Sequence, residues 1–297
     1  MPPETLVVRG DRGVPYSKGL MSQSLSASGI PPERAYELAR RIEARLGGLG
    51  APRIATSELR RVAEDVLEME EGADALRRFR AWERLDHLDR PLLVMIAGTA
   101  GVGKSTLASM LGSRLGITRV IPTDVVRQVL RACFSHEFLP AVHYSSFEAE
   151  RSVDIVTGER DADLLGFARQ AEAVMSGVSA IVDRAVQESM SMVVEGVHLV
   201  PGMTQPRVGD RCVLVEVLVV VEDEERHRAH FPLRGGERPA DRYLDRLEQI
   251  RKLQSYLTER ARTSEVPVVE NASIDASLAT VMELVLDAVD RAAPADR

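Results

Sequence analysis

The sequence predicts an α/β protein in which a doubly wound parallel sheet is preceded by a small, mostly helical domain. From residue 92 to residue 270, continuously apolar runs alternate with amphipathic helical segments. This pattern is typical of a parallel sheet that is covered on both faces. Before residue 89, apolar residues instead recur at helical spacing. Pro91 should stop the last of these early helices, so we expect two domains, 1–88 and 89–297.

The first domain should open with a short strand at Leu6–Val8 and a turn at Gly10–Gly13. Helical spacing of apolar residues then predicts four helices. Their expected ranges are Ser17–Ala27, Pro31–Gly48, Ser57–Met69 and Ala73–Leu85.

The second domain should contain five strands, each a short apolar run. Their expected ranges are Leu92–Ala97, Arg119–Pro122, Met192–Glu195, Val213–Val221 and Val266–Glu270. The clearest helices between them are expected over Lys104–Leu115, Asp161–Glu188 and Arg238–Arg262. Right-handed crossover connections should join these strands.

A glycine-rich loop between the first of these strands and the following helix fits the pattern G-x-x-x-x-G-K-[ST] without a mismatch. Glycines allow backbone N–H groups to surround phosphate oxygens, and the helix adds the positive end of its dipole. The expected nucleotide-binding residues are Gly98, Thr99, Ala100, Gly101, Val102, Gly103, Lys104, Ser105 and Thr106. Lys104 should reach the β- and γ-phosphates, and Ser105 should be a ligand of Mg²⁺. The second domain is therefore predicted to be of the P-loop NTPase type, with ATP and Mg²⁺ as cofactors.

Acidic residues follow two of the predicted strands. Ligands of open α/β sheets bind beyond the carboxyl ends of the strands. Glu195 should therefore orient Mg²⁺ or touch a phosphoryl acceptor, and Asp124 should accept the proton of an attacking hydroxyl or hold Mg²⁺. Arg127 lies one helical turn after Asp124 and should bind an anionic acceptor. The alternatives are an incidental strand-end acid for Glu195 and a helix-capping aspartate beside a surface arginine.

A segment rich in arginine follows the fourth predicted strand of the second domain. Such a segment suits a mobile lid that stabilises the transferring phosphoryl group. Arg234 is the expected catalytic member, and Arg228, Arg238 and Arg242 are expected to contact the substrate. The alternative for each is a solvated charged helix. His198 should either donate to the acceptor or pack at the end of its strand.

Composition excludes several other functions. The net charge of −7 argues against a general nucleic-acid binder. The longest apolar stretch, Val213–Val221, is interrupted by Glu216 and is too short to span a membrane. Two cysteines cannot build a disulfide framework, and no signal peptide is visible at the N-terminus, so a cytoplasmic protein is expected. No N-K-x-D motif of a GTPase is present, and neither is the apolar run ending in Asp-Glu that is typical of a motor ATPase.

Four stretches together resemble the 2-phosphoglycerate kinase family over nearly the whole chain. They are Ala97–Thr106, Pro122–Arg127, Glu195–Gly202 and the arginine-rich segment leading to Arg242–Leu244 and Ile250–Arg251. The resemblance implies ATP- and Mg²⁺-dependent phosphorylation of 2-phosphoglycerate to 2,3-bisphosphoglycerate. The small anionic acceptor would then lie between Arg127 and the lid.

The segment Val7–Lys18 is similar to the opening of an ATP-cone, a small regulatory nucleotide-binding module. Arg9 stands where such modules more often have a lysine. A helical scaffold that packs on the kinase is the alternative, and an exposed helical face there would permit a homodimer.

Two other functions stay open at this point. The first is a P-loop kinase for another small hydroxylated acceptor. The second is a non-catalytic ATP-sensing protein, against which the acids and arginines at the strand ends weigh.

Overall fold

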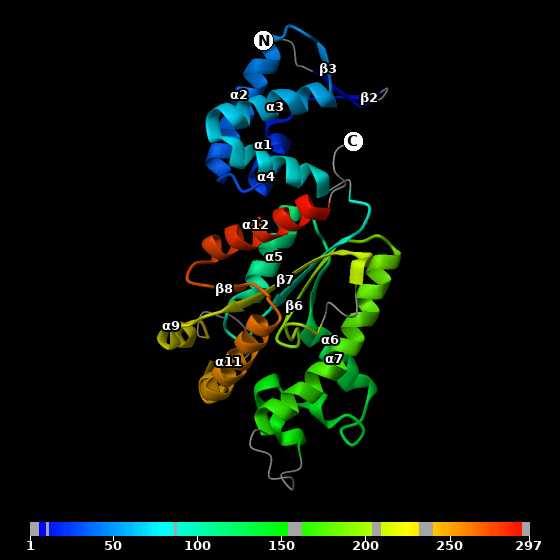
Figure 1. Ribbon diagram of the computed structural model, residues 1–297, viewed down its shortest axis with the longest axis vertical. Coiled ribbons are helices and arrows are strands. Elements are labelled where there is room, and N and C mark those ends of the chain that lie inside the picture. Colours follow the sequence, from blue (N-terminus) through cyan, green and yellow to red (C-terminus); the bar gives the residue numbers. More distant parts are fainter. Residues whose placement is uncertain are drawn as a thin grey trace. The chain divides into compact units, whose positions relative to one another are not determined.

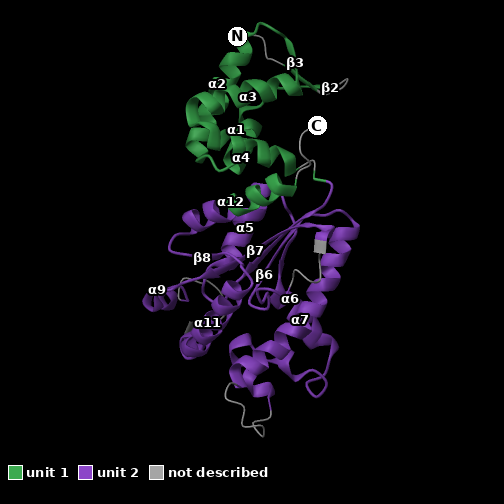
Figure 2. Cartoon of the chain, in the orientation of Figure 1, with its two compact units in different colours: residues 1–88, 282–297 green, residues 89–281 purple. Residues whose placement is uncertain are grey.

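The computed structural model describes residues 6–9, 12–85, 88–153, 162–203, 209–231 and 240–292. The chain divides into two compact units, coloured separately in Figure 2. The first consists of residues 1–88 and 282–297, and the second of residues 89–281. Residues 282–297 therefore group with the first unit, whereas the sequence analysis placed them in the second domain. No helix among the described residues is long and apolar enough to cross a membrane.

The first unit contains a small sheet that the sequence analysis predicted only in part. Strand β1 (Leu6–Arg9) pairs antiparallel with β2 (Arg12–Pro15) and parallel with β3 (Arg53–Ala55). Strand β3 has three residues, of which only Ile54 is apolar and buried, so it left no periodic signal. Gly10 and Asp11 of the expected turn lie outside the described residues.

Four helices accompany this sheet in the described part of the first unit, close to the predicted ranges, and α3 packs against β1 and β3. They are α1 (Lys18–Ala27), α2 (Pro32–Gly48), α3 (Thr56–Glu71) and α4 (Ala73–Arg84). The Ser17 side chain caps α1 by accepting the Leu20 amide, as a serine at this position commonly does. Leu38, Ile42 and Leu67 form part of the buried core of this unit.

The second unit contains a sheet of five strands that are all parallel, which confirms the predicted fold class. The strands are β4 (Leu92–Ala97), β5 (Val120–Pro122), β6 (Met192–Gly196), β7 (Val213–Val220) and β8 (Val268–Glu270). Their order across the sheet is β5-β6-β4-β7-β8. Figure 1 labels β6, β7 and β8. The chain thus builds one side of β4 and then the other. A ligand is expected at the carboxyl end of β4, where this reversal occurs.

Helices of the second unit lie between and beside these strands. They are α5 (Lys104–Leu115), α6 (Thr123–Cys133), α7 (Ala162–Gln187), α9 (Glu224–Ala229), α10 (Ala240–Leu244), α11 (Leu247–Thr263) and α12 (Ile274–Ala292), the last of which continues into the first unit. Short 3₁₀ helices occupy Pro140–His143, Ser146–Ser152 and Gly209–Arg211.

The single helix predicted over Arg238–Arg262 is wrong within the described residues. Helix α10 ends at Leu244 and α11 begins at Leu247, because Arg246 has a non-helical backbone (φ −118°, ψ 19°). Tyr243, before the break, stacks on Phe231, and both belong to the same buried core as Leu247, which follows the break.

Both faces of the central strands are buried, as continuously apolar strands require. Leu93 and Met95 point into a core that also contains Phe167 and Val174 of α7. The alternate residues, such as Val94, face the other way and are equally buried. This leaves the carboxyl ends of the strands as the place where polar side chains can gather.

A buried polar network joins α6, β6 and α7 next to those strand ends. The Gln170 amide donates to the carbonyl oxygens of Ala141 (2.5 Å) and Tyr144 (3.1 Å), so its own oxygen is free to accept. That oxygen lies 3.1 Å from His198 Nε2, which must therefore carry the proton. His198 Nδ1 then accepts from the Thr123 hydroxyl at 2.8 Å. The network holds residues 141–144 against the sheet.

We expect His198 to make stability depend on pH. Desolvation lowers its pKa from 6.5 to about 4, against the attraction of Asp124. Between these two pH values the unfolded chain binds a proton that the folded chain does not, so the free energy of unfolding should rise with pH in this window. The full effect is on the order of 3 kcal/mol.

Thermal unfolding of the wild type and of His198→Gln, followed from pH 4 to pH 7.5, measures this contribution. The rise should shrink in the variant and persist in His136→Gln, whose histidine is exposed. An equal rise in all three proteins would contradict a neutral, buried His198.

Candidate active site

The phosphate loop connects β4 to α5, and its shape depends on three glycines. Gly98, Gly101 and Gly103 all have positive φ angles (153°, 87° and 85°), which side chains with a Cβ rarely adopt. A Cβ on Gly98 would also lie 2.7 Å from the Val219 carbonyl oxygen. Helix α5 begins directly afterwards at Lys104, so the positive end of its dipole faces the loop.

Three side chains from later segments of the chain hold the loop by donating hydrogen bonds to successive carbonyl groups. His227 Nε2 donates to Ala100 O (2.8 Å), and His230 Nδ1 donates to Gly101 O (2.9 Å). The Asn271 amide donates to Val102 O (2.9 Å). These residues follow β7 and β8, far from the loop in sequence.

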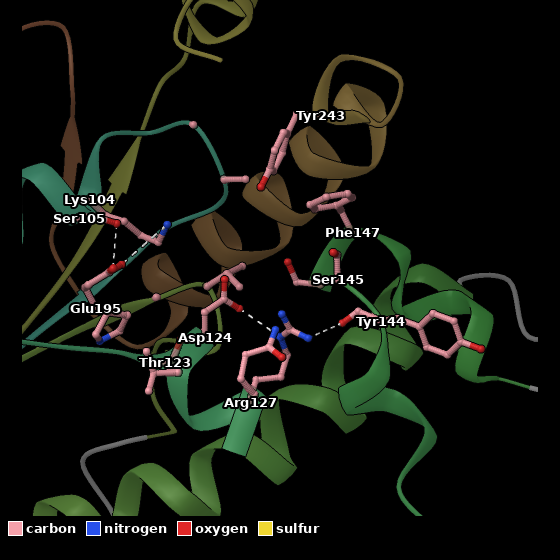
Figure 3. Close-up of a pocket in the computed structure, with 18 of the residues that line it drawn as sticks. Lys104, Ser105, Thr123, Asp124, Arg127, Tyr144, Ser145, Phe147, Glu195 and Tyr243 are labelled. Atoms are coloured by element: carbon pink, nitrogen blue, oxygen red, sulfur yellow. Dashed lines mark hydrogen bonds and ion pairs between the residues drawn. The ribbon is translucent and has the colours of Figure 1, made fainter. Parts of the chain in front are cut away.

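Two charged residues and a hydroxyl meet at the inner side of the loop. The Ser105 hydroxyl donates to Glu195 Oε1 at 2.8 Å, and Lys104 Nζ lies 3.8 Å from Glu195 Oε2 (Figure 3). Lys104 also donates to the Thr99 carbonyl oxygen at 3.3 Å. Lys104 and Glu195 are both nearly buried, with 8% and 5% of their surface exposed. Their pairing lowers the cost of keeping two charges away from water.

Asp124 and Arg127 form a second charged pair at the start of α6. Arg127 Nε donates to Asp124 Oδ1 at 3.1 Å. Partial burial opposes ionisation of Asp124, but the Arg127 charge and hydrogen bond outweigh it, so the pKa of this carboxyl lies below its ordinary value. Asp124 is therefore a carboxylate at neutral pH.

Arg127 makes hydrogen bonds to backbone groups that the sequence pattern did not indicate. Its side chain is 7% exposed, and its Nη1 donates to the carbonyl oxygens of Val142 (3.1 Å) and Tyr144 (3.0 Å). Figure 3 shows the guanidinium group between Asp124 and the Tyr144 carbonyl. Arg127 thus fixes the segment around residue 144 from one side, and Gln170 does so from the other.

One cavity of about 1000 Å³ joins these groups. It is lined by the phosphate loop, by one face of α6, by the segment from His143 to Phe147 and by the carboxyl end of β6. Of the predicted site residues, those in its lining are Ala100, Gly101, Gly103, Lys104, Ser105, Thr106, Asp124, Arg127, Glu195 and Arg242. The structure therefore brings most of the predicted nucleotide and acceptor residues to one place.

The remaining predicted residues have other surroundings. Gly98, Thr99 and Val102 belong to the loop but not to the cavity lining, and Val102 is fully buried. His198 is also fully buried, with Thr123 and Gln170 at its two ring nitrogens, which corresponds to the packed alternative. Arg228 pairs with Glu224 one turn earlier in α9 at 3.3 Å. Arg234 and Arg238 lie outside the described residues.

Arg242 lies at the cavity wall and is already paired. It donates to Ser145 Oγ at 3.1 Å and to the buried carboxylate of Glu148, and its guanidinium carbon is 6.0 Å from the centre of the Phe147 ring. Tyr243 stacks on Phe231 and packs at a tilt against Phe147, with ring centres 5.3 Å and 5.4 Å apart.

Several lining residues were not predicted from the sequence, among them Gln128, Arg131, His143 and Ser145. Helical spacing could have found Arg131, because residues 124, 127, 128 and 131 share one face of α6. Within the described part of the chain, no hydrogen bond or ion pair engages Arg131. Nothing local could have revealed residues 143–147, because their place depends on Arg127 and Gln170.

Comparison with known proteins identifies relatives over nearly the whole chain, although no model of a protein family matches it. The 2-phosphoglycerate kinase of Methanopyrus kandleri is 35% identical over 276 residues, 92% of this chain and 84% of that protein. Those of Methanococcus vannielii (35% over 288 residues) and Pyrococcus horikoshii (32% over 279 residues) cover 95% and 94% of this chain and 92% of each relative. A solved gluconokinase from Sinorhizobium meliloti 1021 aligns over 68% of this chain and 93% of its own chain. Its sequence identity is 15% and its TM-score is 0.39, so this structure supports no inference. On the identity to the curated relatives, the chain belongs to the 2-phosphoglycerate kinase family.

Proposed function

We propose that this protein transfers the γ-phosphoryl group of ATP to a hydroxyl of 2-phosphoglycerate, giving 2,3-bisphosphoglycerate and ADP. In this step the acceptor oxygen forms a bond to the γ-phosphorus, the bond from that phosphorus to the bridging β–γ oxygen breaks, and the hydroxyl proton is released. The observation that carries the proposal is the single cavity lined by both the phosphate loop and the α6 face with Asp124, in a chain of this family. Donor and acceptor can meet there.

The residues of the loop fit ATP and Mg²⁺. The positive φ angles of the three loop glycines and the helix that follows suit a bound phosphate. The Ser105 hydroxyl and the Glu195 carboxylate lie 2.8 Å apart and are oxygen ligands of the kind that Mg²⁺ prefers. When bound, Mg²⁺ would offset the negative charge of the phosphates. Ser105 would bind it directly, with Glu195 beside it or through water.

Lys104 and Asp124 are the proposed catalytic residues nearest to the reacting atoms. Lys104 would neutralise charge on the β- and γ-phosphates, for which its place at the first turn of α5 is suitable. Asp124 would orient the acceptor hydroxyl and receive its proton. The lowered pKa makes Asp124 a weak base. Asp124 would therefore act mainly by orienting the acceptor hydroxyl, because a loose transition state requires little proton transfer before it forms.

Arg131 is the proposed binding residue for the acceptor's phosphate. It is exposed, lines the cavity two helical turns after Asp124, and has no partner among the described residues. Helical side chains lean towards the N-terminus of their helix, so Arg131 reaches back towards the turn that contains Arg127 and Gln128. The Ser145 hydroxyl, on the opposite wall, could donate to the same phosphate. Arg127 would support the wall, and Arg242 would hold Ser145 in place.

Lys104→Ala should lower the rate of phosphoryl transfer at least about 100-fold, because a charge that stabilises the transition state is removed. ADP release and 2,3-bisphosphoglycerate formation, measured together with 2-phosphoglycerate as acceptor, test this. They should appear in equal amounts with the wild type. Lys18→Ala, which removes a surface ion pair with Glu43, is the control and should keep full activity.

Glu195→Gln should raise the Mg²⁺ concentration needed for half-maximal activity, because a neutral amide binds the cation less tightly than a carboxylate. Titration of activity with Mg²⁺ at saturating ATP measures the shift, which should be about tenfold or more. Unchanged Mg²⁺ dependence in a folded variant would remove Glu195 from the metal site.

Arg131→Gln should raise the KM for 2-phosphoglycerate about 10- to 100-fold and leave the KM for ATP unchanged, since a charged hydrogen bond to the acceptor is lost. Glycerol 2-phosphate, which keeps the phosphate, should show the same loss, and D-glycerate, which lacks it, should not. Arg169→Gln is a matched control, because Arg169 is an exposed arginine of the same unit outside the cavity lining. A loss with D-glycerate as large as with 2-phosphoglycerate would contradict this assignment.

A further inference from the structure

A phosphate loop works only if its amide groups point inward, and this structure shows what fixes their direction. In a trans peptide unit the C=O of one residue and the N–H of the next point in opposite directions. The carbonyl groups of Ala100, Gly101 and Val102 are each held by one side chain outside the loop. The N–H groups of residues 101, 102 and 103 must therefore point the other way.

We propose that His227, His230 and Asn271 are positioning residues that preset these three amide groups to bind phosphate. The inference rests on nucleotide binding by the loop, as proposed above. None of the three need touch the nucleotide for this purpose. His227 and Asn271 do not line the cavity at all, and both are buried, with 0% and 6% of their surface exposed.

The contacts around the two histidines leave the loop little freedom to turn over. A Cβ on Gly101 would come within 2.9 Å of His227 Nε2 and 2.7 Å of the Phe231 ring, so the loop backbone lies directly against these groups. The His227 ring stacks on Phe231 at 5.4 Å, and Phe231 stacks on Tyr243 at 5.3 Å. Since a carbonyl can only accept, both histidines donate to the loop, His227 from Nε2 and His230 from Nδ1.

Asn271 is equally well fixed, and it is the only asparagine in the chain. It follows β8, and its backbone N–H donates to the Val220 carbonyl at 2.8 Å. Its side-chain oxygen accepts from the Ser277 hydroxyl at 2.9 Å, which turns the amide nitrogen towards Val102. A Cβ on Gly103 would lie 2.4 Å from that nitrogen, so only glycine allows this approach.

Matched substitutions separate the donated hydrogen bond from packing. His227→Gln keeps a donor at the position of Nε2, whereas His227→Leu keeps only bulk. Asn271→Leu removes the donor at the third carbonyl. Glu225→Leu, at an exposed position of α9, is the control for changes in that helix. Thermal unfolding of each variant shows that it is folded before binding is measured.

The test is calorimetric binding of a non-hydrolysable ATP analogue, compared with the inhibition constant of adenosine, which has no phosphate. His227→Leu and Asn271→Leu should bind the ATP analogue about 10- to 100-fold more weakly, because a bond from an amide to a charged phosphate is weakened. Adenosine should inhibit all variants equally. His227→Gln and Glu225→Leu should bind the analogue as the wild type does.

The outcomes distinguish this inference from the proposed function. If folded His227→Leu and Asn271→Leu bind the analogue like the wild type, or if adenosine binding falls by the same factor, His227 and Asn271 do not position the amides and the inference is wrong. If the wild type itself does not bind the analogue, nucleotide binding and the proposed function fail together with the inference.

Discussion

A peptide group cannot present its N–H and its C=O to the same side, and the phosphate loop depends on this constraint. Three consecutive carbonyl groups, from Ala100 to Val102, accept from side chains that do not belong to the loop. The partners come from segments that follow β7 and β8, which lie on the same side of β4 in the sheet. The order of the strands therefore places the loop at the carboxyl ends of the strands. It also places next to the loop the donors that orient it.

The wall of the cavity formed by α6 and residues 143–147 is held by a second set of buried hydrogen bonds to carbonyl groups. The segment from Ala141 to Tyr144 contains only a short 3₁₀ helix, and its carbonyl groups accept from Arg127 and Gln170. The Gln170 side-chain oxygen fixes the tautomer of His198 by accepting from its Nε2, and Nδ1 then accepts from the Thr123 hydroxyl. A polar residue at the end of a strand can thus matter for the site without meeting the substrate.

The sequence predicted the parallel sheet and the phosphate loop because both leave local patterns. Continuous apolar runs mark buried strands, and the spacing of Gly98, Gly103 and Lys104 marks the loop. It could not predict that Arg127 binds carbonyl groups of residues 142 and 144, since this contact depends on how a segment without periodicity folds back. No glycine or proline stands at the helix break at Arg246, so the sequence pattern did not indicate it. The resemblance of residues 1–88 to an ATP-cone remains a prediction, and so does the formation of a homodimer.

In the proposed reaction two anionic molecules meet in this cavity, so its cations have to be available for binding and also fixed in position. Among the described residues that line it, Lys104 lies beside Glu195, Arg127 beside Asp124, and Arg242 beside Glu148. In each pair the carboxylate fixes the position of the cation and offsets its charge, which reduces repulsion between the cations. Preorganised charge stabilises a transition state better than charge that must move. Arg131 differs because it has no such partner in the described structure. A cation of this kind is suited to binding a substrate, whereas the paired ones are suited to shaping the place where the substrate reacts.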